Sequence, residues 1–523
     1  MAKQSKTYDY IIVGSGAAGS VIANRLSADP ACSVLVLEAG GPPSNAGISE
    51  PGSLVSLWGS DIDWLVKTEP QPGLGGRELT INQGKVVGGS TSINAMMYVR
   101  GNRLNFDMWN ALGADGWSYQ DVLPYFKAIE DYEGGASAYH GTGGEISVRD
   151  CPDMDMRSEA FNLGATELGY DGPYWDTNGA RQENGAGYLQ FHIDKNGKRA
   201  SGATAFLDPV RSRRNLTIET QAQVNRVLIE GKRAVGVEYR QNGQTLQARA
   251  DREVIVSAGT FFSPKLLMLS GIGPEAHLRG LGIDVVADLP GVGQNLQDHM
   301  QLPIVFMSKV DRPAPSLLTG NALFVRTRTD MDAAPPDMQI NFTPAVPKPL
   351  APILNIPVPA FIFLAILVQP KSQGHVQLRS ADPLAAPIVN PNYLQADADL
   401  QAFVQAVKIA RDLAGTKAFE PFTAQELVPG VSANSLEPFI RSQSSTLWHP
   451  AGTCKIGRDA LSVVDPALRV YGVEGLRVAD ASVMPTVTSG NTAAPTFMIG
   501  AKAADMIAHP EMQVAAEALL QPT

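Results

Sequence analysis

Residues 8–40 read YDYIIVGSGAAGSVIANRLSADPACSVLVLEAG, and this stretch decides the fold of the chain. Its first apolar run, Asp9–Val13, is typical of a buried parallel strand. Glycines with the spacing G-x-G-x-x-G follow at once, from Gly14 to Gly19. A helical pattern of apolar residues over 21–26 and a second apolar run, Val34–Leu37, complete a strand–helix–strand unit.

Each glycine of this unit has a physical role at a dinucleotide. Gly14 permits the tight turn, Gly16 lets the backbone approach a pyrophosphate, and Gly19 lets the helix pack close to the strand. The start of the helix offers free N–H groups to the phosphates. Glu38 ends the second strand, where a carboxylate accepts ribose hydroxyl protons. A glycine-rich turn that binds nothing is the weaker interpretation, because all parts occur in order.

Length and composition limit the class of protein. The chain has 523 residues, which predicts two domains. A net charge of −10 without a basic cluster argues against a nucleic-acid partner. The three cysteines form no CxxC motif, so we expect reduced, buried thiols, and no metal-ligand spacing is present. The opening MAKQSK has no signal-peptide pattern, and the longest apolar run, Ala360–Val368, is too short for a bilayer. We therefore expect a cytoplasmic protein without an integral membrane segment.

A second glycine block reads GKVVGGSTSINAMMYVRG and begins at Gly84. Its adjacent glycines, followed by hydroxyl residues, are suited to expose backbone amides to a phosphate or to the polar edge of a flat ring. Small residues also permit close packing, so this block alone leaves both interpretations open.

Together with the opening motif, this block, the later SAGTFFSPKLLMLSGIGP and two C-terminal blocks resemble the glucose–methanol–choline oxidoreductase family. The resemblance covers nearly the whole chain and is weakest between Phe306 and Arg441. It implies an α/β fold, with a Rossmann-like FAD-binding domain that carries an inserted α+β substrate-binding domain. It also implies oxidation of an alcohol. Some members link a histidine covalently to the flavin, but the matching residue here is Ile93, which implies non-covalent FAD.

The resemblance implies a set of cofactor-binding residues, in which Val224 holds the adenine through its backbone. The set is Gly14, Ser15, Gly16, Ala17, Ala18, Gly19, Glu38, Ala39, Trp64, Val87, Gly89, Ser92, Asn94, Ala95, Met96, Met97, Val224, Ala258, Gly259, Trp448, Asp480, Ala481, Asn491 and Thr492. We expect the FAD-binding domain to comprise residues 1–150, 198–302 and 461–523. Residues 151–197 and 303–460 form the expected substrate-binding domain.

Two C-terminal blocks are candidates for the chemistry. In WHPAGT and SGNTAAP, His449 matches the family's base and Asn491 its partner, which is His or Asn among members. A neutral imidazole suits removal of the hydroxyl proton as a hydride leaves for flavin N5. Asp298-His299 resembles a dyad, but a structural role is favoured because adjacent side chains point apart. For His140, in a glycine-rich turn, we expect only a loop-shaping role.

Local patterns predict further elements. A helix over 263–269 should begin with Pro264 at its first position. Residues 337–342, 362–368 and 375–378 should be strands of one sheet in the substrate domain, with an amphipathic helix over 400–413. Further strands are expected at 146–148, 216–219, 224–229, 235–240, 253–257 and 476–479, and further helices over 105–112, 119–131 and 496–507.

The substrate class rests on a proline-rich stretch, residues 344–359. Its six prolines among apolar residues exclude a helix and an inner strand. It either covers the active-site mouth as an apolar lid or packs against its own domain or a second subunit, which leaves a homo-oligomer open. A lid favours alcohols with an alkyl or aryl group over choline or sugars.

Several alternatives remain open at this point. A choline- or sugar-type alcohol dehydrogenase, a redox-inert hydroxynitrile lyase and a light-using flavoprotein share the same fold, and a nicotinamide dehydrogenase is more distant. The electron acceptor, oxygen or another molecule, is also open.

Overall fold

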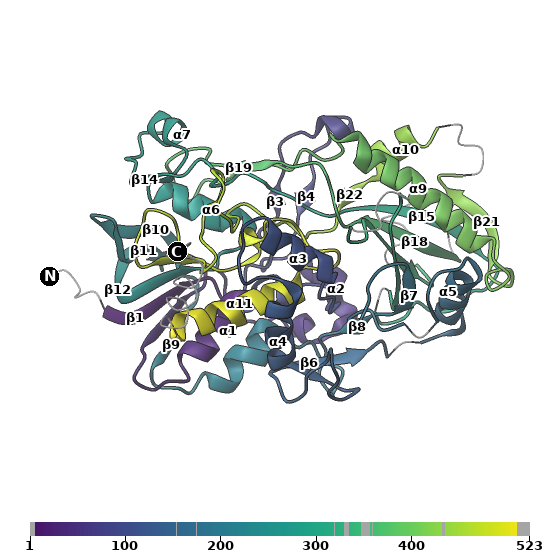
Figure 1. Cartoon of the computed structure of the whole chain (residues 1–523), viewed down its shortest axis with the longest axis horizontal. Coiled ribbons are helices and arrows are strands. Elements are labelled where there is room, and N and C mark those ends of the chain that lie inside the picture. Colours follow the sequence, from purple (N-terminus) through teal and green to yellow (C-terminus); the bar gives the residue numbers. More distant parts are fainter. Residues whose placement is uncertain are drawn as a thin grey trace, which may run out of the picture.

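The computed structural model describes residues 6–509 apart from 153, 174, 318, 329–333, 347–355, 358 and 431–434. The chain forms two lobes side by side, each organised around a seven-stranded sheet (Figure 1). The first lobe holds the N-terminal strand and the last long helix, and the second holds most of the middle of the chain (Figure 1).

The sheet of the first lobe has the order β10-β11-β12-β1-β2-β9, with β23 beside β12. Its central strand β1 lies parallel to both β12 and β2, as expected of a strand buried on both sides. The bounds are β1 Lys6–Val13, β2 Val34–Leu37, β9 Leu216–Glu219, β10 Gln223–Glu230, β11 Arg233–Gln241, β12 Gln244–Val256 and β23 Leu476–Val478. The strands predicted in these regions are confirmed.

Helices α1 (Ala17–Leu26) and α11 (Ala493–Ala508) pack against each other beside this sheet (Figure 1). Their approach is close, because a Cβ on Gly500 would lie 2.7 Å from the Cα of Ala18. The helix predicted over 496–507 is confirmed, with an earlier start.

Helix α6 (Gly259–Leu269) differs from its prediction at the N-terminus. The predicted first position of Pro264 is wrong, because the helix begins at Gly259 and Pro264 lies inside it. Proline cannot donate to the carbonyl one turn earlier, that of Thr260. The Thr453 hydroxyl donates to this carbonyl over 2.6 Å, which satisfies the acceptor and explains why the helix tolerates the proline.

The second lobe contains an antiparallel sheet with the order β21-β15-β18-β17-β16-β7, and β22 beside β15. One face packs on helices α5 (Met156–Glu167) and α9 (Asp397–Ala414) through a phenylalanine-rich core. The bounds are β7 Gly185–Tyr188, β15 Met300–Ser308, β16 Asn321–Val325, β17 Met338–Thr343, β18 Ala360–Leu367, β21 Thr423–Val428 and β22 Ser445–Thr446.

The strand predicted at 375–378 exists, but its assignment to this sheet is wrong. Strand β19 (His375–Gln377) pairs only with β20 (Ile388–Asn390) among the described strands. The Val376 N–H donates to the Gly293 carbonyl over 2.7 Å, so this short pair is tied to a loop of the first lobe instead.

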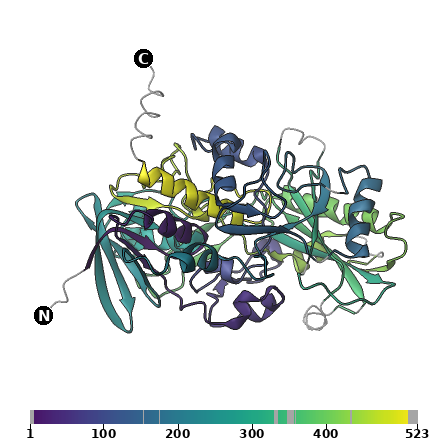
Figure 2. The same cartoon turned by 90° about the horizontal axis from the view of Figure 1, so that it is seen from below.

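Helices α3 (Arg103–Ala111) and α4 (Tyr119–Ile129) lie beside α11, and a small sheet completes the body (Figure 2). The small sheet consists of β5 Glu130–Tyr132, β6 Ile146–Asp150 and β8 Gln190–Phe191. Shorter elements are α2 Leu54–Leu57, α7 Glu275–Gly280, α10 Glu437–Gln443, β3 Val66–Lys67, β4 Thr80–Ile81, β13 Ile272–Gly273 and β14 Ala287–Asp288.

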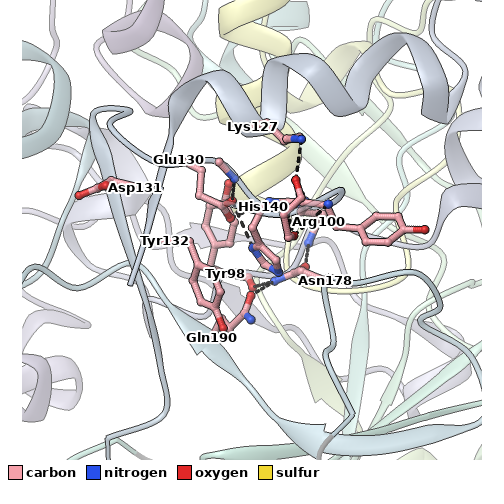
Figure 3. Close-up of polar contacts among 12 residues, drawn as sticks. Tyr98, Arg100, Lys127, Glu130, Asp131, Tyr132, His140, Asn178 and Gln190 are labelled. Carbon is pink, nitrogen blue, oxygen red and sulfur yellow. Dashed lines mark hydrogen bonds and ion pairs between the residues drawn. The ribbon is translucent and has the colours of Figure 1, made fainter. Parts of the chain in front are cut away.

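His140 does more than shape a loop. Its Nδ1 lies 3.2 Å from Glu130 Oε2 and its Nε2 3.0 Å from Asp176 Oδ2, and its ring stacks on Tyr132 (Figure 3). The buried Arg100 pairs with Glu130 over 2.7 Å. Both imidazole nitrogens face carboxylates, so both carry protons, and these contacts raise the pKa of His140 above its usual value against the effect of burial.

The three cysteines are buried. Over the described ranges, no helix is long and apolar enough to cross a membrane, and no group of three or more His, Cys, Asp or Glu could hold a metal ion.

Candidate active site

A cavity of about 840 Å³ is lined by residues of both lobes. At one end it is lined by Glu38, Val224 and Pro383, and at the other by strands β15, β17 and β18. The predicted residues that line it are Gly14, Gly16, Ala17, Ala18, Glu38, Ala39, Trp64, Gly89, Asn94, Ala95, Met96, Met97, Val224, Ala258, Gly259, Trp448, His449, Asp480, Ala481, Asn491 and Thr492.

Four predicted residues, Ser15, Gly19, Val87 and Ser92, do not line the cavity. They lie directly behind its wall. A Cβ on Gly19 would lie 2.1 Å from the Gly14 carbonyl oxygen, so Gly19 serves the contact between helix and turn. The Ser92 hydroxyl donates to the Val87 carbonyl over 2.9 Å, which holds the second glycine block in shape.

The glycine blocks form a cradle that fits a pyrophosphate. A Cβ on Gly16 would meet nothing within 4 Å, so the backbone at Gly16 borders open space at the start of α1. Gly89 of the second block approaches from the other side, where its Cβ would lie 2.8 Å from the Cα of Gly16. Backbone N–H groups at a helix start bind phosphate oxygens, so the cradle fits the diphosphate of FAD.

Glu38 is held at the adenosine end of the cavity. Its Oε2 accepts from the Ser15 N–H (3.0 Å) and hydroxyl (2.7 Å), and its Oε1 accepts from the Gly40 N–H (2.8 Å). Burial raises the pKa of Glu38, while these hydrogen bonds oppose the change. A carboxylate has about four acceptor positions, so capacity remains for a ribose hydroxyl.

Asp480 lies beside the start of α6. It accepts from the N–H groups of Gly259 and Ser482, both over 2.8 Å, and from the Ser263 hydroxyl over 2.5 Å. These bonds fix the turn that brings Asp480 and Ala481 to the cavity wall.

His449 and Asn491 come together at the far end. His449 Nε2 lies 3.3 Å from Asn491 Nδ2, and His449 Nδ1 lies 3.0 Å from His299 Nδ1. With the Asn491 amide as donor, Nε2 carries a lone pair and Nδ1 a proton. Burial lowers the pKa of His449 to about 3, so the ring is neutral at physiological pH. The arrangement can therefore accept a proton at Nε2.

Two buried polar atoms at this end have no partner among the described residues, Asn491 Oδ1 and Trp448 Nε1. One is an acceptor and the other a donor, and both residues line the cavity. Buried polar groups normally find partners, so these atoms fit a bound cofactor or substrate.

The backbone before His449 is strained and is held by Asp298 and Thr446. Trp448 has φ of 62°, unusual for a bulky residue. Its N–H donates to the Thr446 hydroxyl, and the His449 N–H donates to Asp298 Oδ1, both over 2.8 Å. The hydroxyls of Thr446 and Tyr393 donate to Asp298 Oδ2. Asp298 and His299 thus contact the candidate base from two directions, which extends the structural role expected of them.

Where the second lobe lines the cavity, the lining side chains form rows across neighbouring strands. In one row, Leu364 of β18 lies between Pro303 of β15 and Asn341 of β17, and in the next, Ile362 lies between Val305 and Thr343. Val346, Ile356 and Val428 extend the apolar part. We call this end of the cavity the substrate chamber. Ile353 and Leu354 of the predicted lid lie outside the described residues, so the lid stays a prediction.

Charge is confined to the cofactor end. Among the described lining residues, the Asp, Glu, Lys and Arg side chains are Glu38, Lys265 and Asp480, and none of them belongs to the substrate chamber. Lys265 donates to the carbonyls of Pro383 and Ala385, and burial lowers its pKa to about 8.

The sequence interpretation missed Trp58, Lys265 and the contact of His299 with His449. Trp58 lines the cavity and packs against Trp448 in a tilted arrangement, with 4.5 Å between ring centroids. Trp58 lies in a long connection between strands, where no periodic pattern of apolar residues could identify it. Lys265 lines the cavity from α6 together with the apolar Leu266 and Leu269. A single lysine in an otherwise apolar helix is the sequence signal that could have identified it.

Comparison with known proteins agrees with these observations. Family models described as GMC oxidoreductase match residues 8–301 and 370–500. The oxygen-dependent choline dehydrogenase of Brucella ovis is 40% identical over 531 residues, which cover 95% of each chain. Pyridoxine 4-oxidase from Mesorbium loti has a TM-score of 0.89 and 32% identity, over 96% of this chain and 99% of that chain. A formate oxidase of Aspergillus oryzae, studied for FAD modification, has a TM-score of 0.88 and 28% identity over 98% of this chain and 100% of that one.

Proposed function

The chain is a member of the GMC oxidoreductase family, and we propose that it oxidises a neutral alcohol with an alkyl or aryl group to an aldehyde or ketone. The family makes it an FAD-dependent oxidoreductase acting on CH–OH donors. Its relatives are named for choline, pyridoxine and formate, so the scaffold alone does not select the substrate.

In this proposal bound FAD would supply the hydride acceptor, and the side chains of the protein move the proton. His449 Nε2 takes the hydroxyl proton, because its lone pair faces the chamber and its Nδ1–H is held by His299. Asn491 orients the substrate oxygen without titrating. The proposed FAD-binding domain comprises residues 1–150, 198–302 and 461–523, and residues 151–197 and 303–460 form the proposed substrate domain.

The observation that carries the substrate class is the uncharged chamber. A quaternary ammonium that leaves water needs a carboxylate or an aromatic cage to replace its hydration. The described chamber residues offer no carboxylate, and Pro303, Leu364, Ile362 and Val305 form an apolar wall. Binding of an alkyl or aryl group is stabilised there in proportion to the apolar area that it buries.

Choline is the second candidate. The 40% identity to a choline dehydrogenase and the Trp58–Trp448 pair on the cavity wall favour it. Tryptophan faces attract cations, so the pair could hold a trimethylammonium group.

The test compares kcat/KM for benzyl alcohol, 1-hexanol, ethanol and choline. We expect benzyl alcohol or 1-hexanol to be best, and Leu364→Ser to lower their kcat/KM roughly tenfold, the effect of about one buried methylene or more. Ethanol is the control, since it is too short to gain much from this wall. Choline as the best substrate would refute the proposal, as would an unchanged preference in Leu364→Ser.

A further inference from the structure

Arg199 is a buried cation that the proposed reaction does not use. It is 2% exposed and lies in the segment before the π-helical turn Ala203–Leu207. Its Nη1 donates to the backbone carbonyl of Asn94 (2.6 Å), to Asn94 Oδ1 (2.8 Å) and to the Thr91 carbonyl (3.3 Å). Its Nε donates to the Ile48 carbonyl over 2.7 Å. All these acceptors are neutral.

Each of the other buried arginines in the described ranges has a carboxylate partner. Arg100 pairs with Glu130, Arg157 with Asp155 and Arg477 with Glu253. Arg199 forms no ion pair within the described part of the chain, and its buried Nη2 has no hydrogen-bond partner there. Burying an unpaired charge costs free energy, so we expect an arginine in this position either to bind an anion or to have a function.

The neighbour of Arg199 cannot supply that anion. His192 Nε2 lies 3.1 Å from Asn94 Nδ2, and its Nδ1–H donates to the Ala200 carbonyl over 2.7 Å. Burial, followed by the charge of Arg199, lowers the pKa of His192 to about 3, so its ring is neutral. Burial also lowers the pKa of Arg199, to about 9, which leaves it charged at neutral pH.

The position of the charge relates it to the flavin. Asn94, which binds the guanidinium, lines the cavity together with Ala95, Met96 and Met97. This segment leads into the substrate chamber, because the Asn341 amide reaches the Met97 sulfur over 3.8 Å. The redox-active end of FAD must lie near the chamber and His449. Arg199 therefore lies behind the cavity wall at that end, with Thr91 and Asn94 between its guanidinium and the cavity.

We propose that Arg199 tunes FAD electrostatically, with an uncompensated positive charge that favours the reduced, electron-rich cofactor. Reduction adds two electrons, and wherever fewer than two protons follow, the ring becomes negative and a nearby cation stabilises it. This role concerns the cofactor alone and does not depend on which alcohol is the substrate. Arg199 is a positioning and tuning residue, since it reaches the cavity only through its contacts with Thr91 and Asn94.

A purely structural role is the alternative, in which Arg199 ties residues 48, 91 and 94 together. Two variants separate the roles, because Arg199→Lys and Arg199→Gln both lose most of these contacts but only glutamine loses the charge. The measurement is the ratio of oxidised to reduced flavin in holoprotein at equilibrium with a reference dye. It needs no alcohol substrate.

For Arg199→Gln, we expect this ratio to shift toward oxidised flavin by on the order of tenfold, as for one charge at an effective dielectric constant of about 20. That corresponds to about 30 mV for a two-electron couple. Arg199→Lys should match the wild type at low pH. An unshifted Arg199→Gln, or an Arg199→Lys shifted equally at low pH, would overturn the proposal.

A pH series keeps the test decisive if Arg199→Gln fails to fold or to hold FAD. A buried, unpaired ammonium loses its proton at lower pH than a guanidinium. The ratio in Arg199→Lys should therefore depart from that of the wild type as pH rises. The window must stay below the pKa of Arg199, about 9, so that the wild type keeps its charge. A difference that stays constant from about pH 6 to about pH 8 would contradict the electrostatic role.

Discussion

His449 Nδ1 lies 3.0 Å from His299 Nδ1, although 150 positions separate the two residues in sequence. Each neutral imidazole has one donor and one acceptor nitrogen, so one of these atoms donates and the other accepts. With the proton on His449 Nδ1, the lone pair of Nε2 points toward Asn491 and the chamber. In this tautomer the His449 Nδ1–H donates to His299, which thereby stabilises the form in which His449 can act as a base.

Replacement of His299 by Leu removes the acceptor. We expect kcat to fall by roughly 10–100-fold, as for loss of a group that orients a functional histidine, with little change in KM. Replacement by Gln keeps an acceptor oxygen, so His299→Gln should recover part of the loss. Steady-state kinetics of both variants check this. A His299→Leu enzyme with wild-type kcat would show that the contact does not control the tautomer.

Gly16 tests the cradle for the diphosphate. Its Cβ position is open, so Gly16→Val should leave the fold intact but place two methyl groups where the cofactor binds. Gly280 is the control, because its Cβ position is also open but lies on the exposed end of α7. We expect a large loss of bound FAD, measured by absorbance per protein, for Gly16→Val and none for Gly280→Ala. Equal flavin content in both variants would place the diphosphate elsewhere.

The attachment of the flavin follows from Ile93. This residue lines the cavity where some family members carry a linking histidine, and an alkyl side chain forms no bond to the flavin. We expect the purified protein to be yellow and acid precipitation to release the flavin into the supernatant. Flavin that stays with the precipitate would mean that another residue forms a covalent link.

The His140 cluster predicts a pH-dependent stability. Contacts with Asp176 and Glu130 raise the pKa of His140 above 6.5, against the effect of burial. The contribution of His140 to the free energy of unfolding is therefore full below pH 6.5 and is lost as pH rises through the raised pKa. The pKa values of Glu130 and Asp176 are lowered, so their contributions are full above pH 4.5 and 3.8 and are lost in more acidic solution.

We therefore expect His140→Gln to lower the free energy of unfolding most near pH 5 to 6. The difference from the wild type should shrink toward pH 9, as measured by urea denaturation. A difference that grows with pH would contradict a protonated His140 between two carboxylates.

Local patterns predicted the first lobe well, because a strand–glycine–helix unit is encoded by neighbouring residues such as Gly14 and Gly19. The pairing of distant segments was harder to predict. The extended pattern at 375–378 indicates a strand but not its partner, which is β20, nor the contact of Val376 with Gly293 that ties this pair to the first lobe. The contacts of Asp298 and His299 with His449, and the unpaired state of Arg199, likewise depend on tertiary packing. The cytoplasmic location, the domain boundaries and the electron acceptor stay predictions.

The most direct test of the central claim is anaerobic reduction of the flavin by an alcohol, followed in a stopped-flow spectrometer. With the preferred alcohol of the panel, wild-type flavin should bleach, and His449→Ala should bleach roughly 10²–10⁴-fold more slowly, the usual contribution of a positioned base. Alcohol affinity should change less, because the base acts mainly in the transition state. A His449→Ala protein that is reduced at the wild-type rate, or a wild-type flavin that resists every alcohol, would contradict the account.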